Sequence, residues 1–172
     1  MKRKVIVLSL ILIIINFIGP YKYDNNKVIN YIQQHKSSKS KSMCAWYVMQ
    51  ALRYGGCRYC YIYPAYAYNK VLPKLGFKEV PINNYVPQKG DISVLPTNVS
   101  SVFGHIAIYD GNCWISDFEQ KSIFPGKYYK QNGKYQIYRI KNGWHWAFIY
   151  ENPKNLIEYL SVLFKGWNKI KF

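Results

Sequence analysis

Two residue types that together support covalent catalysis, a cysteine and a histidine, occur in this 172-residue chain in well-defined local contexts. Cys44 lies in the stretch SMCAWYVMQAL, two residues after Ser42, which can cap a helix. Four residues have the i, i+4, i+7, i+8 spacing of one buried helix face: Cys44, Val48, Ala51 and Leu52. A helix N-terminus favours the thiolate, which is the nucleophilic form of cysteine. The same spacing also fits a Cys44 that only packs as a small buried apolar residue. A partner base near the sulfur would favour the catalytic interpretation.

The candidate for that base is His105, which opens the strand-like stretch GHIAIYDG. Alternation along a strand puts His105 with Ala107 and Tyr109 on one face, and the two isoleucines on the face that we assign to the core. His105 is therefore expected to look away from the apolar layer, toward a helix or a cleft. A histidine that only caps a strand has the same pattern. The other histidines are weaker candidates, because His35 lies in a polar segment and His145 lies between two tryptophans just after an Asn-Gly turn.

Asp117, in the stretch CWISDFEQ, is the predicted third member of the site. If the turn after GHIAIY is a three-residue loop over residues 110–112, His105 and Asp117 lie directly opposite each other on one sheet face. Cβ atoms in such a pair are about 5 Å apart, which lets a carboxylate orient an imidazole. A two-residue Asp-Gly turn would instead place them on opposite faces, unless a bulge intervenes. The neighbouring Glu119 and Gln120 are further candidates for polar support.

The remaining cysteines are Cys57, Cys60 and Cys113. The stretch CRYC matches C-x-x-C, but it lacks the βαβ context of a redox motif. A zinc site would need a second ligand pair at suitable spacing, which the chain does not offer. A disulfide between Cys57 and either Cys60 or Cys113 stays an alternative, and its connectivity cannot be read from the sequence.

The N-terminal residues indicate an exported protein, and the charge bears on its partners. The chain carries 24 Lys+Arg against 8 Asp+Glu, a formal net charge of +16. MKRK followed by the apolar run VIVLSLILIIINFIG has the layout of a secretory signal or of a membrane anchor. We expect a periplasmic or extracellular protein, tethered to the membrane if that segment is retained. Its basic surface suits wall polymer or anionic lipid, whereas the scattered Lys and Arg and the lack of a motif argue against nucleic acid.

Helical patterns precede strand patterns along the chain, which predicts an α+β fold of N-terminal helices packed on a central antiparallel sheet. Strands are expected in KGDISVL, GHIAIY and CWISDF, and a hairpin across Asn142-Gly143 joins YQIYRIK to HWAFIY. We divide the chain into a signal peptide or N-terminal anchor (1–20), a tether (21–41), a domain (42–152) and a basic amphipathic C-terminal helix (153–172).

Three of these stretches, in this order, resemble a known family. CAWYVMQALR is similar to the cysteine stretch of CHAP domains, which are related to NlpC/P60 enzymes, and PQKGDISVL and GHIAIYDGNCWISDFEQ resemble the two strand motifs that follow it. The resemblance covers residues 40–125, about half of the chain. It implies a papain-like fold, a catalytic domain over residues 42–152, and a thiol peptidase that cleaves amide bonds in peptidoglycan peptides. It implies no cofactor and no metal.

The same resemblance implies roles for the three candidate residues: Cys44 as nucleophile, His105 as general base and Asp117 as the orienting group. Many relatives carry Gln directly before the cysteine, where this chain has Met43. An oxyanion would then depend on backbone donors. Two other hypotheses stay open. One is a non-catalytic exported module of the same fold that binds cell-wall polymer or anionic membrane, and the other is a related acyl transferase.

Overall fold

The computed structural model describes residues 18–57 and 63–148. Residues Gly19–Ala147 form one compact unit. Our expectations for an N-terminal signal or anchor, for Cys60 and for a basic C-terminal helix fall mainly or wholly outside the described residues. Among the helices that are described, none has the length and apolar character needed to span a bilayer.

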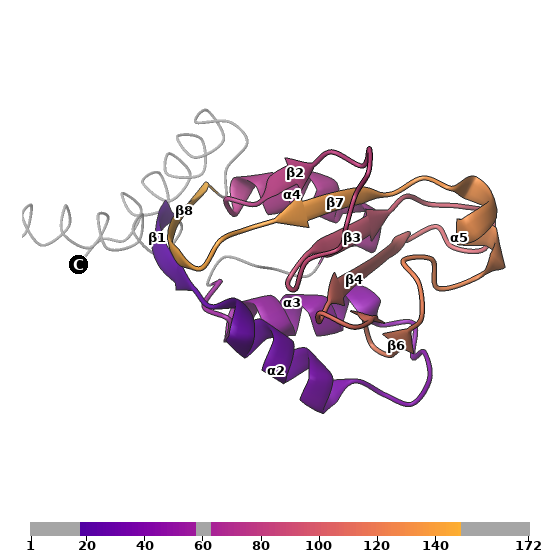
Figure 1. The fold of residues 1–172 in the computed structure, drawn as a ribbon, viewed down its shortest axis with the longest axis horizontal. Helices are drawn as coiled ribbons and strands as arrows, with labels where there is room; N and C mark the ends of the chain where they lie inside the picture. Colours follow the sequence, from indigo (N-terminus) through magenta and orange to yellow (C-terminus); the bar gives the residue numbers. More distant parts are fainter. Residues whose placement is uncertain (1–17, 58–62, 149–172) are drawn as a thin grey trace, which may run out of the picture. The chain divides into compact units, whose positions relative to one another are not determined.

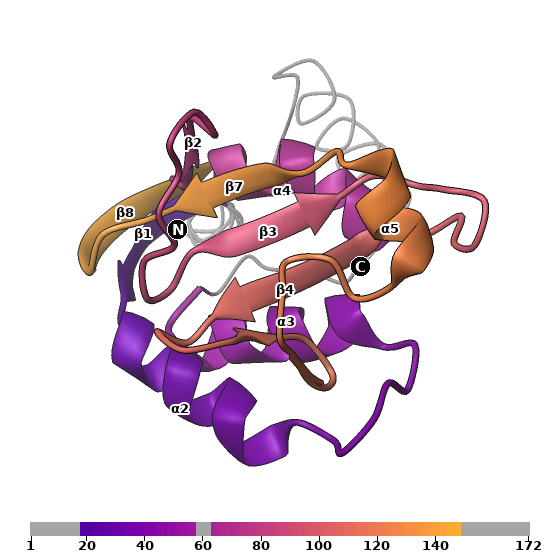
Figure 2. The same ribbon diagram turned by 45° about the vertical axis from the view of Figure 1, so that its right-hand side comes forward.

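The centre of the unit is a six-stranded sheet in the order β2-β7-β3-β4-β5-β6 (Figures 1 and 2). All of its neighbouring strands pair antiparallel. The strands are β2 (Lys78–Val80), β3 (Ile92–Leu95), β4 (His105–Tyr109), β5 (Trp114–Ile115), β6 (Glu119–Gln120) and β7 (Gln136–Arg139). The predicted α+β class is confirmed. The strands expected in KGDISVL, GHIAIY and CWISDF are β3, β4 and β5, and they are neighbours in this order.

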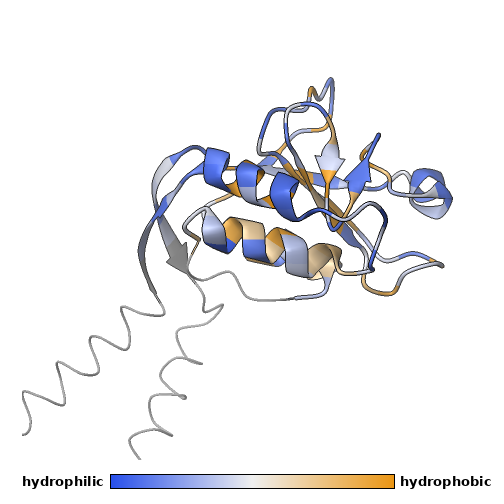
Figure 3. Cartoon of the chain, turned by 90° about the horizontal axis from the view of Figure 1, so that it is seen from below, coloured by the Kyte–Doolittle hydropathy of each residue, from blue (hydrophilic) through white to orange (hydrophobic). Residues whose placement is uncertain are grey.

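Two antiparallel helices, α2 (Asn25–His35) and α3 (Cys44–Tyr54), pack on each other, and α3 packs on β4 (Figure 1). Figure 3 shows the difference between them: α2 is mostly hydrophilic, and α3 is much more hydrophobic. The predicted face of α3 is buried at Val48, Ala51 and Leu52. This burial fixes the helix that carries Cys44 against the strand that carries His105.

Residues 21–41 are part of this unit rather than the tether that we expected from their polar composition. The side chain of Asp24 caps α2 by accepting from the N–H groups of Asn26 and Lys27. The apolar residues of α2 (Val28, Ile29 and Ile32) are almost completely buried. A short helix with one such stripe is enough to join the core, because burial of a few large side chains outweighs a polar average.

The expected hairpin across Asn142-Gly143 is wrong. β7 pairs with β2 and β3, whereas β8 (Gly143–Phe148) pairs with β1 (Ile18–Tyr23) in a separate two-stranded sheet. The side chain of Asn142 accepts a hydrogen bond of 2.8 Å from the backbone N–H of Asn25, at the start of α2. This long-range contact takes the turn residue away from a local hairpin, and the chain then runs toward β1.

The remaining helices are short. They are the 3₁₀ turn η1 (Ala65–Ala67), α4 (Tyr68–Lys74) and α5 (Lys127–Asn132). The helix predicted in PAYAYNKVLPKLGF is therefore η1 and α4, with Pro73 inside its end. No pattern in the sequence predicted α5, which is one and a half turns long and has a single buried residue, Tyr129.

Both faces of the sheet are covered. Ala107 of β4, on the face that we assigned away from the core, packs in a second apolar cluster with Trp114 and Ile137. Partly buried aromatic and aliphatic residues, among them Tyr85, Tyr109 and Tyr135, close that cluster. His105 therefore opens to solvent only at the end of the sheet, where β4 begins.

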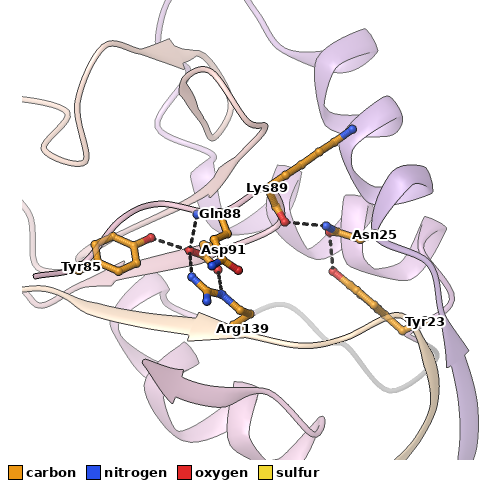
Figure 4. A network of polar contacts seen from close by, with 7 residues as sticks. All are labelled: Tyr23, Asn25, Tyr85, Gln88, Lys89, Asp91 and Arg139. Carbon is orange, nitrogen blue, oxygen red and sulfur yellow. Dashed lines mark hydrogen bonds and ion pairs between the residues drawn. The ribbon is translucent and has the colours of Figure 1, made fainter. Parts of the chain in front are cut away.

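The Gly-Asp motif before β3 has a structural role (Figure 4). Asp91 is completely buried, and its carboxylate accepts from Arg139 Nε at 2.6 Å and Nη2 at 2.7 Å. The hydroxyl of Tyr85 and the N–H of Gln88 donate to the same carboxylate at 2.7 and 2.8 Å. Such a bidentate pair with its remaining lone pairs satisfied joins β3, β7 and the preceding turn.

Candidate active site

A cavity of about 620 Å³ lies at the end of the sheet where β4 begins. Four parts of the chain line it: the loop that leads from α2 into α3, the residues before β4, residues 117–118 after β5, and the segment that carries α5. Figure 2 shows how α5 lies beside β3 and β4. The predicted residues Cys44, His105 and Asp117 all line this cavity.

Cys44 is the first residue of α3, and the helix N-cap is Met43 without a side-chain hydrogen bond. Ser42, the cap that we expected, instead has a positive φ of 58°. The backbone amide of Ile106, the residue after His105, lies within hydrogen-bonding reach of the Cys44 sulfur. Burial raises the pKa of the Cys44 thiol, the amide of Ile106 lowers it, and the charge of Asp117 raises it further. The net direction is upward, so the helix terminus does not outweigh burial here.

His105 is 6% exposed and lies at the beginning of β4. Burial lowers its pKa to about 4, although the negative charge of Asp117 and the contact with Gln120 act in the opposite direction. Its ring is 5.8 Å from the ring of Tyr129 on α5, measured between centroids. Burial raises the pKa of the Tyr129 hydroxyl, and a thiolate at Cys44 would raise it further. These couplings place Tyr129 close to both catalytic candidates.

A chain of polar contacts runs from His105 to Asp117. The amide nitrogen of Gln120 is 2.8 Å from His105 Nε2 and donates to Ser116 Oγ at 2.9 Å. Ser116 Oγ donates to Asp117 Oδ1 at 3.0 Å. The other amide atom, Gln120 Oε1, is buried without a partner. The direct ring contact of His105 is thus with Gln120, which the sequence indicated only as a further candidate.

Asp117 reaches the cavity by a different hairpin from the one that we expected. β4 and β5 pair Ile108 with Ile115 and Tyr109 with Trp114, so the loop has four residues, 110–113. The side chain of Asp110 closes that loop by accepting from the N–H groups of Asn112 and Cys113, both at 2.8 Å. The chain then bends at Ser116 and Asp117, which brings the carboxylate to the cavity without a direct strand pair to His105.

The Asp117 carboxylate holds the segment that precedes the cysteine. Asp117 Oδ2 accepts from the backbone N–H groups of Lys41 at 2.5 Å and Met43 at 3.2 Å, and from Ser40 Oγ at 3.3 Å. Earlier in the same segment, the backbone N–H of Ser37 donates to the backbone carbonyl of Asp117 at 2.7 Å. Asp117 therefore supplies the acceptor that we had expected from a local helix cap.

The other histidines and cysteines lie outside this cavity. His35 is exposed and stacks on Tyr31, and His145 packs between Tyr21 and Tyr23 with its Nε2 2.6 Å from the carbonyl of Lys141. Cys57 and Cys113 are buried free thiols, so no disulfide joins them. Within the described ranges, no group of three or more His, Cys, Asp or Glu side chains is arranged to hold a metal ion.

No protein-family model and no curated protein matches the chain. Two solved structures do. One is the native type VI effector–immunity complex Tae3–Tai3 from Ralstonia pickettii, with a TM-score of 0.64, 34% identity, and coverage of 69% of this chain and 100% of that chain. The other is the selenomethionine form of that complex, with a TM-score of 0.61, 34% identity, and coverage of 65% and 98%. The expected papain-like fold is confirmed. With 34% identity over the full length of the matched chain, this protein belongs to the family of the type VI effector Tae3.

Proposed function

We propose that this protein hydrolyses amide bonds in peptidoglycan peptides, with Cys44 as nucleophile and His105 as general base. The observation that carries the proposal is the convergence of these two residues on one open cavity, with the amide of Ile106 at the sulfur. Cys44 is a free thiol, which covalent catalysis requires. Membership of the Tae3 effector family supports a hydrolase that attacks the wall of a bacterial cell.

In the proposed reaction, His105 takes the thiol proton of Cys44 as the sulfur attacks the carbonyl carbon of the scissile amide. The contact with Gln120 engages Nε2, so in this proposal Nδ1 accepts the thiol proton, which requires the neutral ring to carry its own hydrogen on Nε2. The tetrahedral oxyanion then collapses, the C–N bond breaks, and the imidazolium gives its proton to the departing amine. His105 next activates a water molecule, which hydrolyses the thioester and restores the thiol.

Two residues share the third role in this proposal. Gln120 holds the imidazole ring through its direct contact, and Asp117 favours the imidazolium through its charge while it anchors residues 40–43. The unpartnered Gln120 Oε1 is relevant to the first role. Nε2 is a donor both in the neutral ring that accepts the thiol proton at Nδ1 and in the imidazolium, and the Gln120 amide can accept from it only with Oε1 turned toward the ring.

We also propose that the protein acts outside the cytoplasm and that another protein can inhibit it. The apolar N-terminal sequence supports export. Both matched structures are complexes of an effector with an immunity protein. The cavity here is bordered by strongly exposed apolar residues, Val99, Val102 and Phe103, which an inhibitor that blocks the cavity would cover.

Digestion of purified peptidoglycan tests the proposal. The parent protein should release muropeptides with new free amine and carboxyl ends, and Cys44→Ser and His105→Ala should each lower the rate at least ~10²-fold. Cys113→Ser is the matched control, because Cys113 is a buried thiol away from the cavity, and it should keep the parent rate. Equal product from the parent and from Cys44→Ser would end the hydrolase proposal. Binding of insoluble wall material without product release would support the non-catalytic module instead.

A further inference from the structure

The two-stranded sheet β1–β8 has one buried and one exposed face. On the buried face, Tyr21 and Tyr23 are 2% and 1% exposed, and His145 packs against both rings. Tyr23 also contacts Phe77 edge to face, with centroids 5.6 Å apart. Since residues alternate along a strand, their neighbours must point the other way.

The opposite face presents two tryptophans to solvent. Trp144 is 72% exposed and Trp146 is 60% exposed, two residues apart on β8. Pro20 and Lys22 of β1 are exposed as well and share this face. Large aromatic residues exposed side by side are unusual on a protein surface without a partner, and here a lysine accompanies them. We call this set of four residues the tryptophan face.

The strands that carry the tryptophan face are fixed to the rest of the unit. Tyr21 donates its hydroxyl to the backbone carbonyl of Leu75, and Asn142, directly before β8, is bonded to the start of α2. Asn25 in turn donates to the carbonyl of Lys89 at 2.8 Å (Figure 4). The strands that present the two indole rings are therefore held to the rest of the unit by long-range hydrogen bonds.

The sequences that adjoin this face point to its partner. Residues 1–17, MKRKVIVLSLILIIINF, lead directly into β1, and β8 leads directly into residues 149–172, which include NLIEYLSVLFKGWNKIKF, an amphipathic pattern with lysines gathered toward its end. Both sequences have the composition of membrane-associated segments, one by its apolar run and the other by its basic amphipathic pattern. Covalent continuity alone brings β1 and β8 to wherever these sequences bind.

We infer that the tryptophan face lies on an anionic lipid surface. Indole rings prefer the membrane–water interface, where the apolar ring enters the headgroup region and the N–H stays hydrated. Lys22 can extend its ammonium to lipid phosphates, and the net charge of +16 adds attraction to the surface as a whole. This inference does not depend on the proposed reaction, because none of the four residues lines the catalytic cavity.

Quenching of tryptophan fluorescence by brominated lipid tests this contact with the full chain. The protein is bound to vesicles of phosphatidylcholine and phosphatidylglycerol in which the phosphatidylcholine carries bromine on its acyl chains. Bromine in the acyl region quenches only indole rings that reach the lipid. We expect the quenched fraction to be about 1.5-fold or more larger in the parent than in the Trp144→Phe/Trp146→Phe variant. Trp46→Phe on α3 is the matched control and should not lower the quenched fraction.

Iodide quenching of the parent gives a second readout that requires no substitution. Iodide should reach the tryptophan pair in solution and lose access when vesicles are added. The inference is overturned if the double variant and the parent are quenched equally by brominated lipid. It is also overturned if iodide access falls with protein concentration alone, which indicates a second copy, or only with purified peptidoglycan, which indicates a wall-binding face.

Discussion

At the scale of single residues, burial is the strongest influence on the two catalytic candidates. It raises the pKa of the Cys44 thiol and lowers the pKa of His105 to about 4. At neutral pH the free protein therefore holds an uncharged thiol and an uncharged imidazole rather than an ion pair. An uncharged imidazole can accept the thiol proton, so this state suits general-base activation during attack.

The pH dependence of thiol alkylation follows from these directions. Iodoacetamide reacts with the thiolate, so the alkylation rate of Cys44 should keep rising above pH 9, the ordinary pKa of a cysteine thiol. The rate is measured on a Cys57→Ser/Cys113→Ser background, with the Cys44→Ser version of that background as control. A plateau that begins below about pH 7 would show a preformed thiolate–imidazolium pair and contradict the prediction.

The low pKa of His105 also makes folding depend on pH. The unfolded chain binds a proton at His105 near pH 6.5, but the folded protein does so only near pH 4. The unfolded state thus holds more protons between these values, and stability falls as the pH drops from about 6.5 to 4. The free energy of unfolding should fall by about 3 kcal/mol over this pH range. Urea unfolding of the parent and of His105→Asn at several pH values should show this slope only in the parent. If the free energy of unfolding had the same pH dependence in both proteins, His105 would not be the cause.

At the scale of elements, the sequence was sufficient for pieces whose signals are local. The face of α3 follows helical periodicity, and β3, β4 and β5 follow from short β-rich runs between turn residues. Two features depended on distant groups and were missed: Asn142 bonds to α2, and Asp117 replaces Ser42 as the acceptor before α3. No local pattern reports such contacts. The four-residue length of the β4–β5 loop is different, because the Asp110 side chain sets it through residues two and three positions on.

Gly104, directly before β4, is a position where any side chain would be strained. Its φ is +69°, and a Cβ atom there would lie 2.5 Å from the carbonyl oxygen of Leu95. Gly104→Ala should therefore destabilise the protein by more than about 1 kcal/mol in urea unfolding. Gly126→Ala is the control, since its Cβ would meet nothing within 4 Å and its φ of −167° is ordinary extended backbone. Equal losses in the two variants would refute the steric explanation.

The Asp91–Arg139 pair gives a second prediction at this scale. Arg139→Ala leaves a buried carboxylate without its cation, and it should lower the free energy of unfolding by about 3 kcal/mol. Arg139→Lys keeps the positive charge but loses the bidentate geometry, so it should lower the free energy of unfolding by less than Arg139→Ala does. Thermal or chemical unfolding measures both. A loss for Arg139→Ala no larger than for an exposed change such as Lys70→Ala would show that the pair contributes little.

At the scale of the whole molecule, the net charge of +16 predicts strong dependence of wall binding on salt. The distance over which charges act falls from about 10 Å at 0.1 M salt to about 3 Å at 1 M. Binding of the inactive Cys44→Ala variant to anionic peptidoglycan preparations should accordingly weaken at least ~10-fold across that range. Co-sedimentation measures it, with a neutral polysaccharide as reference. Salt-independent binding would point to a non-ionic mode of recognition.

The contacts between residues 36–43 and residues 117–119 have a consequence for any shortened or hybrid version of this protein. Ser37 and Phe118 form a parallel bridge, Lys36 pairs with Glu119, and the Asp117 carboxylate receives the N–H groups of Lys41 and Met43. Each of these two stretches is therefore held in place by the other. A truncation that begins at the cysteine helix, or a chimera that exchanges one stretch with a relative but not the other, would leave the nucleophile intact in sequence and displaced in space.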